Sequence, residues 1–123
     1  MKSTYNWGIL ATGKIAGKFA EGLATLPDAN LLATGSRNLQ KAQSFANTHA
    51  IHRAYGSYEE LVQDPEIDII YVATPHPYHL ENTLLAIEHR KHVLCEKPMA
   101  LNTHQAKKMI QAAQDKGVFL MEA

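Results

Sequence analysis

The sequence predicts an α/β fold built on a doubly wound parallel sheet with strand order 3-2-1-4-5-6. Two observations predict this fold. Short apolar runs alternate with helical patterns along the whole chain, and the runs are nearly continuous, as in strands buried on both faces. A turn of small residues at positions 11–16 joins the first strand to the first helix. We therefore expect one nucleotide-binding domain of the Rossmann type over residues 1–123.

Composition excludes several classes of protein. The chain has 123 residues, 46% hydrophobic and 20% charged, which is ordinary for one globular domain. Its formal net charge is zero, so we expect no nucleic-acid or anionic-membrane partner, and no apolar run is long enough for a bilayer. Because the N-terminal residues lead directly into the first apolar run, we expect no signal peptide. Cys95 is the single cysteine, which excludes an internal disulfide and favours a cytoplasmic location.

The first half of the chain gives three strands and three helices. We expect strands at residues 7–10, 30–35 and 49–53, from their apolar runs. Helical spacing predicts helices at 13–24 and 39–48, the first ending at Pro27. Ser57 and Glu60 form a capping box that opens a short helix, closed by Pro65. The helical residues expected to face the core are Ile15, Phe19, Leu23, Ala42, Phe45 and Ala46.

The second half repeats the alternation. Residues 67–74 are β-branched and apolar, and predict the fourth strand. A helix then runs to about Arg90, a fifth strand covers 92–95, and a helix starts at Asn102 or Thr103 and ends at Gly117. Residues 118–121 predict the sixth strand. The helical residues expected to face the core here are Leu80, Leu84, Ile87, Ala106, Ile110 and Ala113.

The turn at residues 11–16, Ala-Thr-Gly-Lys-Ile-Ala, is a variant of the dinucleotide fingerprint G-x-G-x-x-G/A. Gly13 keeps the position where backbone approaches a pyrophosphate, and Ala16 lets the helix pack close to the strand. Ala11 replaces the first glycine. Because alanine does not adopt positive φ cheaply, we expect a turn of another shape. A strand-to-helix turn without a ligand is the alternative interpretation.

Ligands of such sheets bind at the carboxyl ends of the strands, where the strand order reverses between strands one and four. The residues at these ends are therefore the candidate cofactor contacts. They are Ala11, Thr12, Gly13, Lys14, Ile15, Ser36, Arg37, Ala73, Thr74, Pro75, His76, His79, Glu96 and Lys97.

The end of the second strand favours NADP over NAD. An NAD enzyme carries an acid near this point, but here Ser36 and Arg37 follow the strand, 24 residues after Gly13. A guanidinium binds a 2′-phosphate with two parallel hydrogen bonds, and Lys41 adds a second cation. A bond to a charged group contributes about 1.5–3 kcal/mol, which is roughly a tenfold to hundredfold preference. There are two alternatives. Arg37 could be exposed to solvent without a ligand, or it could stack on the adenine ring, in which case the site would also accept NAD.

His76 and His79 are three residues apart after the fourth strand and share one face of a starting helix. We expect them to hydrogen-bond the cofactor or substrate, with Pro77 favouring the helix start. The alternatives are a metal site, for which no nearby cysteine or carboxylate completes the ligand set, and a His79 that caps the helix or faces solvent. We therefore predict no metal.

Lys97 lies between Glu96 and Pro98 at the end of the fifth strand, where it would project toward the reacting end of the cofactor. An ordinary lysine pKa near 10.4 is too high for a base at neutral pH, but burial and an oxidised nicotinamide would both lower it. Glu96 could fix the ammonium. Such a lysine can take the proton of a carbinol while hydride leaves, or return it in the reverse direction. A surface turn without chemistry is the alternative.

Taken together, residues 8–16, 35–37, 73–79 and 95–99 resemble the nucleotide domain of the glucose–fructose oxidoreductase / inositol dehydrogenase (Gfo/Idh/MocA-like) family. Residues 54–61, 93–99 and 119–123 are most similar to a subgroup that oxidises diols or a sugar with NADP. The resemblance covers the whole chain. It implies Lys97 as a catalytic lysine near the nicotinamide, His79 and Tyr71 as residues of the cofactor site with His79 a second catalytic candidate, and Arg37 as the 2′-phosphate contact.

The resemblance also implies a second, C-terminal domain that this chain does not contain. In the family that domain supplies the substrate wall, a further acid/base residue and the dimer interface, so we expect a homo-oligomeric parent enzyme acting on a sugar or diol. The chain alone should bind NADP, with NAD possible, and show negligible turnover. The alternatives are a module that senses NADP(H) without chemistry, which would not need Lys97, and an inert fragment.

Overall fold

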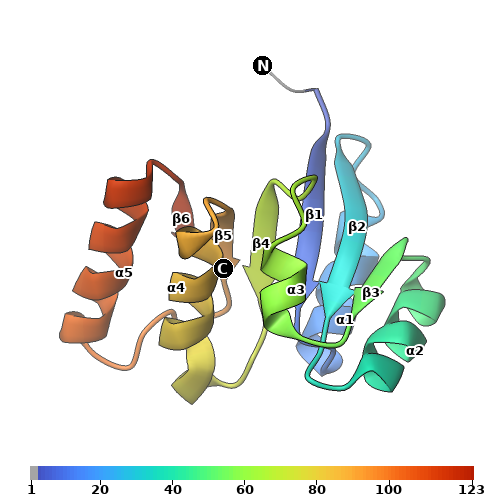
Figure 1. The fold of residues 1–123 in the computed structure, drawn as a ribbon, viewed down its shortest axis with the longest axis horizontal. Helices are drawn as coiled ribbons and strands as arrows, with labels where there is room; N and C mark the ends of the chain where they lie inside the picture. Colours follow the sequence, from blue (N-terminus) through green and yellow to red (C-terminus); the bar gives the residue numbers. More distant parts are fainter. Residues whose placement is uncertain (1–2) are drawn as a thin grey trace.

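Six parallel strands form a single sheet in the computed structural model, which describes residues 3–123 (Figure 1). The first two residues, placed by the sequence ahead of the first strand, lie outside the described residues. The strands are β1 (Tyr5–Leu10), β2 (Ala29–Gly35), β3 (Arg53–Tyr55), β4 (Ile69–Val72), β5 (His92–Cys95) and β6 (Leu120–Glu122). Their order is β3-β2-β1-β4-β5-β6, with every pair parallel, which confirms the predicted doubly wound sheet.

Helices connect the strands as predicted. They are α1 (Lys14–Leu23), α2 (Leu39–His49), α3 (Tyr58–Val62), α4 (His79–Glu88) and α5 (Thr103–Lys116), with a 3₁₀ turn η1 (His76–Tyr78) before α4. The prediction for the third strand was wrong, because α2 continues to His49 and ends at Ala50 in the left-handed conformation, so pairing with β2 begins only at Arg53. Within residues 3–123, no helix has the length and apolarity needed to cross a membrane.

The sheet buries side chains on both faces, in two separate clusters. One cluster joins β4 residues such as Ile70 and Val72 to α3, α4 and α5. The other joins Tyr71 and Ala73 to α1 and α2. Successive strand residues therefore enter opposite cores, as the alternation of a strand requires, and helices cover both faces (Figure 1).

The helical stripes agree with the predictions only in part. Ala42, Phe45 and Ala46 of α2 are buried as expected. Ile15 and Ile110 were predicted to face the core, but they are 42% and 47% exposed. In α1 the buried residues are Ala16, Ala20 and Leu23, and in α5 they are Met109 and Ala113. In α4 the buried stripe is largely polar, with His79, Asn82 and Thr83 inside, while Leu80 and Leu84 are half-buried.

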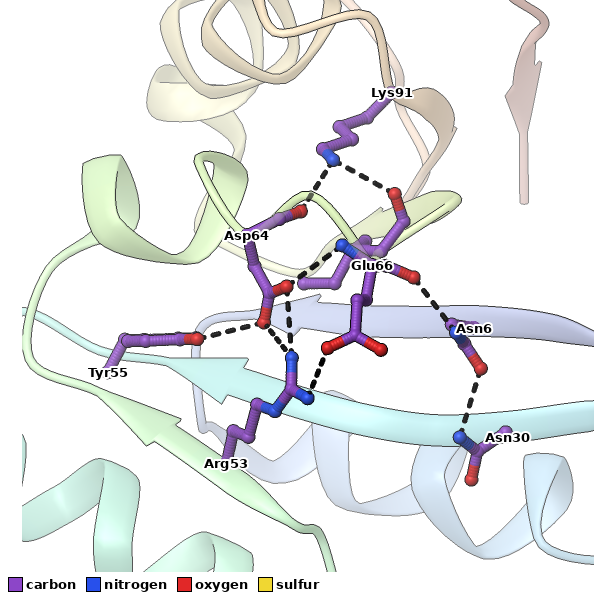
Figure 2. A network of polar contacts seen from close by, with 8 residues as sticks. Asn6, Asn30, Arg53, Tyr55, Asp64, Glu66 and Lys91 are labelled. Atoms are coloured by element: carbon purple, nitrogen blue, oxygen red, sulfur yellow. Dashed lines mark hydrogen bonds and ion pairs between the residues drawn. The ribbon is translucent and has the colours of Figure 1, made fainter.

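A polar network ties together the amino-terminal edge of the sheet (Figure 2). Asp64 is buried and accepts hydrogen bonds from Arg53 Nη1 at 2.8 Å, from the Tyr55 hydroxyl at 2.8 Å and from the Glu66 amide at 3.0 Å. Burial alone would raise the pKa of this carboxyl, but the bonds from Arg53, Glu66 and Tyr55 outweigh it and hold the pKa below its ordinary value. The network joins β3 to the segment that enters β4.

Lys91 joins the network from the other side. Its buried ammonium donates to the carbonyl oxygens of Asp64 at 2.6 Å and Ile67 at 2.9 Å (Figure 2). Burial lowers the pKa of Lys91, and the nearby carboxylates only partly oppose that shift. Because Lys91 directly precedes β5, this edge is braced from β3 to β5.

Candidate functional site

The candidate site lies at the carboxyl edge of the sheet, where β1, β2 and β4 end. A cavity of about 940 Å³ opens between the β1–α1 turn and the β2–α2 turn. Thr12 and Gly13 line it from the first turn, and Ser36, Arg37 and Lys41 line it from the second. Among the described residues that line the cavity there is no aspartate or glutamate. The cavity therefore presents cations and hydroxyls to a ligand, which favours an anion.

The first turn keeps the shape that the glycine fingerprint requires, contrary to the expectation from sequence. Ala11 has φ of 102°, in the region that favours glycine. Its amide donates to the Gly35 carbonyl at 3.0 Å, and the Ala73 amide donates to the Leu10 carbonyl at 3.1 Å, so both neighbouring strands hold this segment. The prediction of another turn shape was wrong because these bonds fix the backbone against the local preference of alanine.

The N-terminus of α1 is open toward the cavity. Gly13 is its N-cap with no side-chain hydrogen bond, and the first turn carries no acid. By contrast, α2, α3 and α5 each begin with a polar side chain that accepts a hydrogen bond from an amide of the first turn. Asn38 accepts from the Lys41 amide, Ser57 from the Glu60 amide and Asn102 from the Gln105 amide. Unpaired amides and the positive end of a helix dipole form an anion site. The pyrophosphate of a dinucleotide fits this arrangement, with Lys14 and Ile15 exposed beside it.

The second turn supplies the polar groups expected for a 2′-phosphate. Ser36 is buried, and its hydroxyl oxygen accepts from the Asn38 amide at 3.3 Å, which leaves its hydrogen free to donate. Arg37 and Lys41 are exposed and line the same cavity. The structure thus brings together the three residues that the sequence assigned to one phosphate.

Arg37 also borders a second cavity of about 350 Å³, together with Tyr58, Pro75 and Tyr78. Burial raises the pKa of Tyr58, and the nearby Arg37 guanidinium partly opposes this shift. This second cavity is lined by Glu59 and Glu81, so its charge differs from that of the first. Arg37 therefore lies between the first cavity, whose described lining residues include no acid and which suits a phosphate, and the second cavity, which is lined by acidic residues and by the rings of Tyr58, Pro75 and Tyr78.

The segment after β4 divides into buried and exposed parts. Ala73 and Thr74 are buried, and the Thr74 hydroxyl accepts from Asn82 Nδ2 at 3.2 Å. Pro75 and His76 are exposed and remain available to a ligand.

His79 lies buried between two turns of the chain. Its ring is 1% exposed, with Nδ1 at 2.8 Å from the Pro98 carbonyl and Nε2 at 2.7 Å from the Thr74 carbonyl. Both ring nitrogens therefore lie within hydrogen-bonding distance of carbonyl oxygens of the protein. Across residues 3–123, no three side chains of the metal-binding types converge. His79 thus bridges two turns of the chain, and a direct catalytic or cofactor contact by this residue stays a prediction.

Tyr71, near the end of β4, is also buried. Its ring is 1% exposed and stacks on Phe19 at a centroid distance of 3.8 Å. Its hydroxyl donates to the Glu96 carboxylate, and burial together with this bond raises the pKa of the phenol. Glu96 therefore binds Tyr71, rather than the Lys97 ammonium proposed from the sequence. A place for Tyr71 in the cofactor site stays a prediction, and Glu96 is the residue of that candidate site which its hydroxyl contacts.

Lys97 stands at the end of β5, on the same edge as the cavity. Glu96 is half-buried and its amide still pairs with β4 through the Val72 carbonyl, at 3.0 Å. Lys97 and Pro98, joined by a cis peptide bond, are exposed. The burial that the sequence argument assumed for Lys97 is therefore absent in this chain, and any shielding of the ammonium must come from a bound molecule or another domain.

Three residues of the site were missed by the sequence argument. Asn38 could have been found, because asparagine at a helix start is a strong cap. Tyr58 and Asn82 could not, because each reaches the site from a helix whose rotation depends on tertiary packing.

Comparison with known proteins agrees with this geometry. A family described as "Oxidoreductase family, NAD-binding Rossmann fold" matches residues 5–123. Trans-1,2-dihydrobenzene-1,2-diol dehydrogenase of Danio rerio is 52% identical over 119 residues, covering 95% of this chain and 36% of the relative. The chain thus spans about a third of the length of the curated relatives it matches. These matches confirm the family that the motifs predicted.

Solved structures match the fold closely. An NAD-binding oxidoreductase from Klebsiella pneumoniae superimposes with a TM-score of 0.91 at 33% identity, covering 98% of this chain and 34% of that one. KijD10, a 3-ketoreductase from Actinomadura kijaniata, in complex with NADP and TDP-benzene, gives 0.92 at 28% identity, covering 97% and 37%. Structural relatives are thus described with NAD in one case and NADP in another.

Proposed function

The chain belongs to the oxidoreductase family with an NAD-binding Rossmann fold, and on this premise we propose that it is the NADP-preferring nucleotide domain of an enzyme that oxidises a carbinol of a sugar or diol. One observation carries the cofactor proposal. The acid-free cavity combines the uncapped N-terminus of α1 with Ser36, Arg37 and Lys41. A ligand that fills it should carry one anionic group for each turn, as the pyrophosphate and 2′-phosphate of NADP do.

The first turn would hold the pyrophosphate, and the second would hold the 2′-phosphate. Amides at the start of α1 donate to the pyrophosphate, close to Gly13, whose exposed position leaves room for a ligand. Arg37 and Lys41 neutralise the 2′-phosphate, and the free Ser36 hydrogen donates to it. Pro75, His76 and Glu96 lie farther along the same edge and would border the remainder of the dinucleotide.

Lys97 is the proposed proton-transferring residue. Bound NADP would supply the hydride acceptor. In the oxidative direction, the unprotonated Lys97 amine takes the hydroxyl proton of the carbinol while the C–H bond breaks and the carbonyl forms. In the reductive direction, the ammonium returns that proton to the carbonyl oxygen. Its exposure leaves Lys97 free to reach a substrate at this edge.

The proposed substrate class rests on the names of the relatives, because no residue of this chain indicates it. The curated relatives are named as dehydrogenases of a dihydrodiol, which does not favour a sensor without chemistry. We propose that the surface selecting the sugar or diol, and the homo-oligomer contact, belong to a C-terminal domain outside these residues. A cytoplasmic location stays a prediction from Cys95.

The experiment is a calorimetric titration of the chain with NADPH and with NADH, repeated with Arg37→Ala. We expect NADPH to bind roughly tenfold to a hundredfold more tightly, and the mutant to lose that difference. Arg90→Ala is the control, because this exposed arginine precedes β5 at the opposite edge of the sheet. Equal binding of both cofactors would refute the phosphate assignment. No binding of either would refute the claim that this domain forms the site by itself.

A further inference from the structure

We propose that Glu122 is a positioning residue of the candidate site, because its carboxylate holds the turn that carries Lys97. This inference rests on the proposed role of Lys97. Glu122 is the last residue of β6, the edge strand of the sheet. The cofactor cavity does not include it, and the resemblance of residues 119–123 gave it no role.

The contact itself is short and direct. Glu122 Oε2 accepts from the Met99 amide at 2.7 Å, within the range of a bond strengthened by charge. The backbone of β6 fixes the carboxylate in place, since Glu122 pairs with Cys95 and the Ala123 amide donates to the Cys95 carbonyl at 2.8 Å. Burial raises the pKa of Cys95, and the charges of Glu122 and Glu96 add to that shift, so both carboxylates lie near the end of β5.

The turn has few other supports. After Glu96 the chain leaves the sheet, and Lys97 and Pro98 are exposed. Three side chains from other elements bind the turn directly after Lys97: His79 of α4 at the Pro98 carbonyl, Glu122 of β6 at the Met99 amide, and Cys95 of β5 with a weak thiol bond of 3.9 Å to the Met99 carbonyl. His79 and Glu122 thus hold adjacent residues of the turn from two different elements. Removing the exposed tether should loosen Lys97 while the buried one keeps the fold.

The tether is remote from the phosphate contacts. Four strand spacings separate β6 from β2, which precedes Arg37. At about 4.8 Å each, this is about 19 Å. A change at Glu122 should therefore alter Lys97 without altering the preference between NADPH and NADH. This separates the inference from the test of the cofactor.

Two substitutions distinguish a hydrogen bond from a charge. Glu122→Gln keeps an oxygen that accepts from the Met99 amide, whereas Glu122→Ala removes it. Glu88→Ala is the matched control, an exposed glutamate on α4. We would measure amide hydrogen exchange at Met99 by NMR in each variant of the 123-residue chain. The second readout is the shift of the Lys97 Cε signal on saturation with NADP.

We expect Met99 exchange to be about tenfold faster in Glu122→Ala, and within about twofold of the parent chain in Glu122→Gln and Glu88→Ala. The Lys97 signal should respond to NADP in the parent and in Glu122→Gln, and much less in Glu122→Ala. Unchanged Met99 exchange in Glu122→Ala would overturn the tether. Fast exchange of the Met99 amide in Glu122→Gln would also overturn the tether. This variant therefore decides whether the tether exists even if Glu122→Ala does not fold. A Lys97 signal that responds equally in all variants would overturn the positioning role.

If NADP binds neither the parent chain nor any variant, the claim that this domain forms the cofactor site by itself fails, and the positioning role fails with it. The Met99 comparison still decides whether the tether exists. The two failures are therefore recognisable from separate measurements.

Discussion

Replacing Ala11 with glycine should stabilise the fold, although glycine usually destabilises ordered backbone. Ala11 has φ of 102°, and a residue with a side chain held there costs on the order of 1–3 kcal/mol. Two terms oppose the gain. Glycine adds about 0.4–1 kcal/mol of unfolded-chain entropy, and the lost half-buried methyl is worth about 0.4 kcal/mol, half of a fully buried one. The net expectation for Ala11→Gly is a free energy of unfolding about 1 kcal/mol higher.

Urea denaturation followed by circular dichroism measures this difference through the midpoint at constant slope. Ala24→Gly is the matched control, since Ala24 has φ of −61° at the end of α1 and gains nothing from glycine. It should lose up to about 1 kcal/mol. If both variants lose stability to the same degree, Ala11 is not strained, and the account of how the first turn keeps its shape is wrong.

Three further predictions concern packing, pH and turnover. Gly35→Ala should lower the free energy of unfolding by about 1–3 kcal/mol, because a Cβ there would meet Leu61 Cβ at 3.0 Å. Gly22→Ala has open space around the new Cβ and should raise the free energy of unfolding by about 0.5–1 kcal/mol, as measured by urea denaturation. The pKa of Asp64 is lower in the folded chain than in the unfolded chain, where it is about 3.9, so its ionised carboxylate stabilises the fold above that pH. This stabilisation is lost as the pH falls through the folded-state pKa. The difference in stability between urea melts at pH 7 and pH 3 should therefore be smaller in Asp64→Asn. The isolated chain should bind NADPH yet show negligible oxidation of sugars or diols in absorbance assays at 340 nm, and robust turnover would contradict the assignment of substrate selection to another domain.

The order of the strands could be predicted from the sequence because each strand is apolar and each helix start is marked by local chemistry. Ser57 and Asn102 cap their helices as their side chains predict. The rotation of the helices was less predictable. Ile110 and Met109 are adjacent and both apolar, and only packing against the sheet decides that Met109 is buried. Strand β3 was misplaced because its position depends on pairing with β2, which no local pattern encodes.

In the candidate site, too, features set by local sequence could be predicted and features set by tertiary packing could not. Ser36, Arg37 and Lys41 come from one short segment, so their convergence on one cavity followed from their spacing. His79 could not be placed, because its partner Pro98 is 19 residues away and the bond forms only in the folded chain. Tyr71 was assigned to the cofactor site only through the resemblance to a family, and the strand alternation directs its ring into the core.

The network of Arg53, Asp64 and Lys91 lies at the sheet edge opposite to the one proposed for the cofactor (Figure 2). This polar bracing and the proposed recognition surface are therefore carried by different residues on different loops. Such a division makes the domain easy to diversify. Substitutions at the recognition edge can change ligand choice without weakening the brace, and a stronger brace can compensate for costly residues such as Ala11 at the other edge.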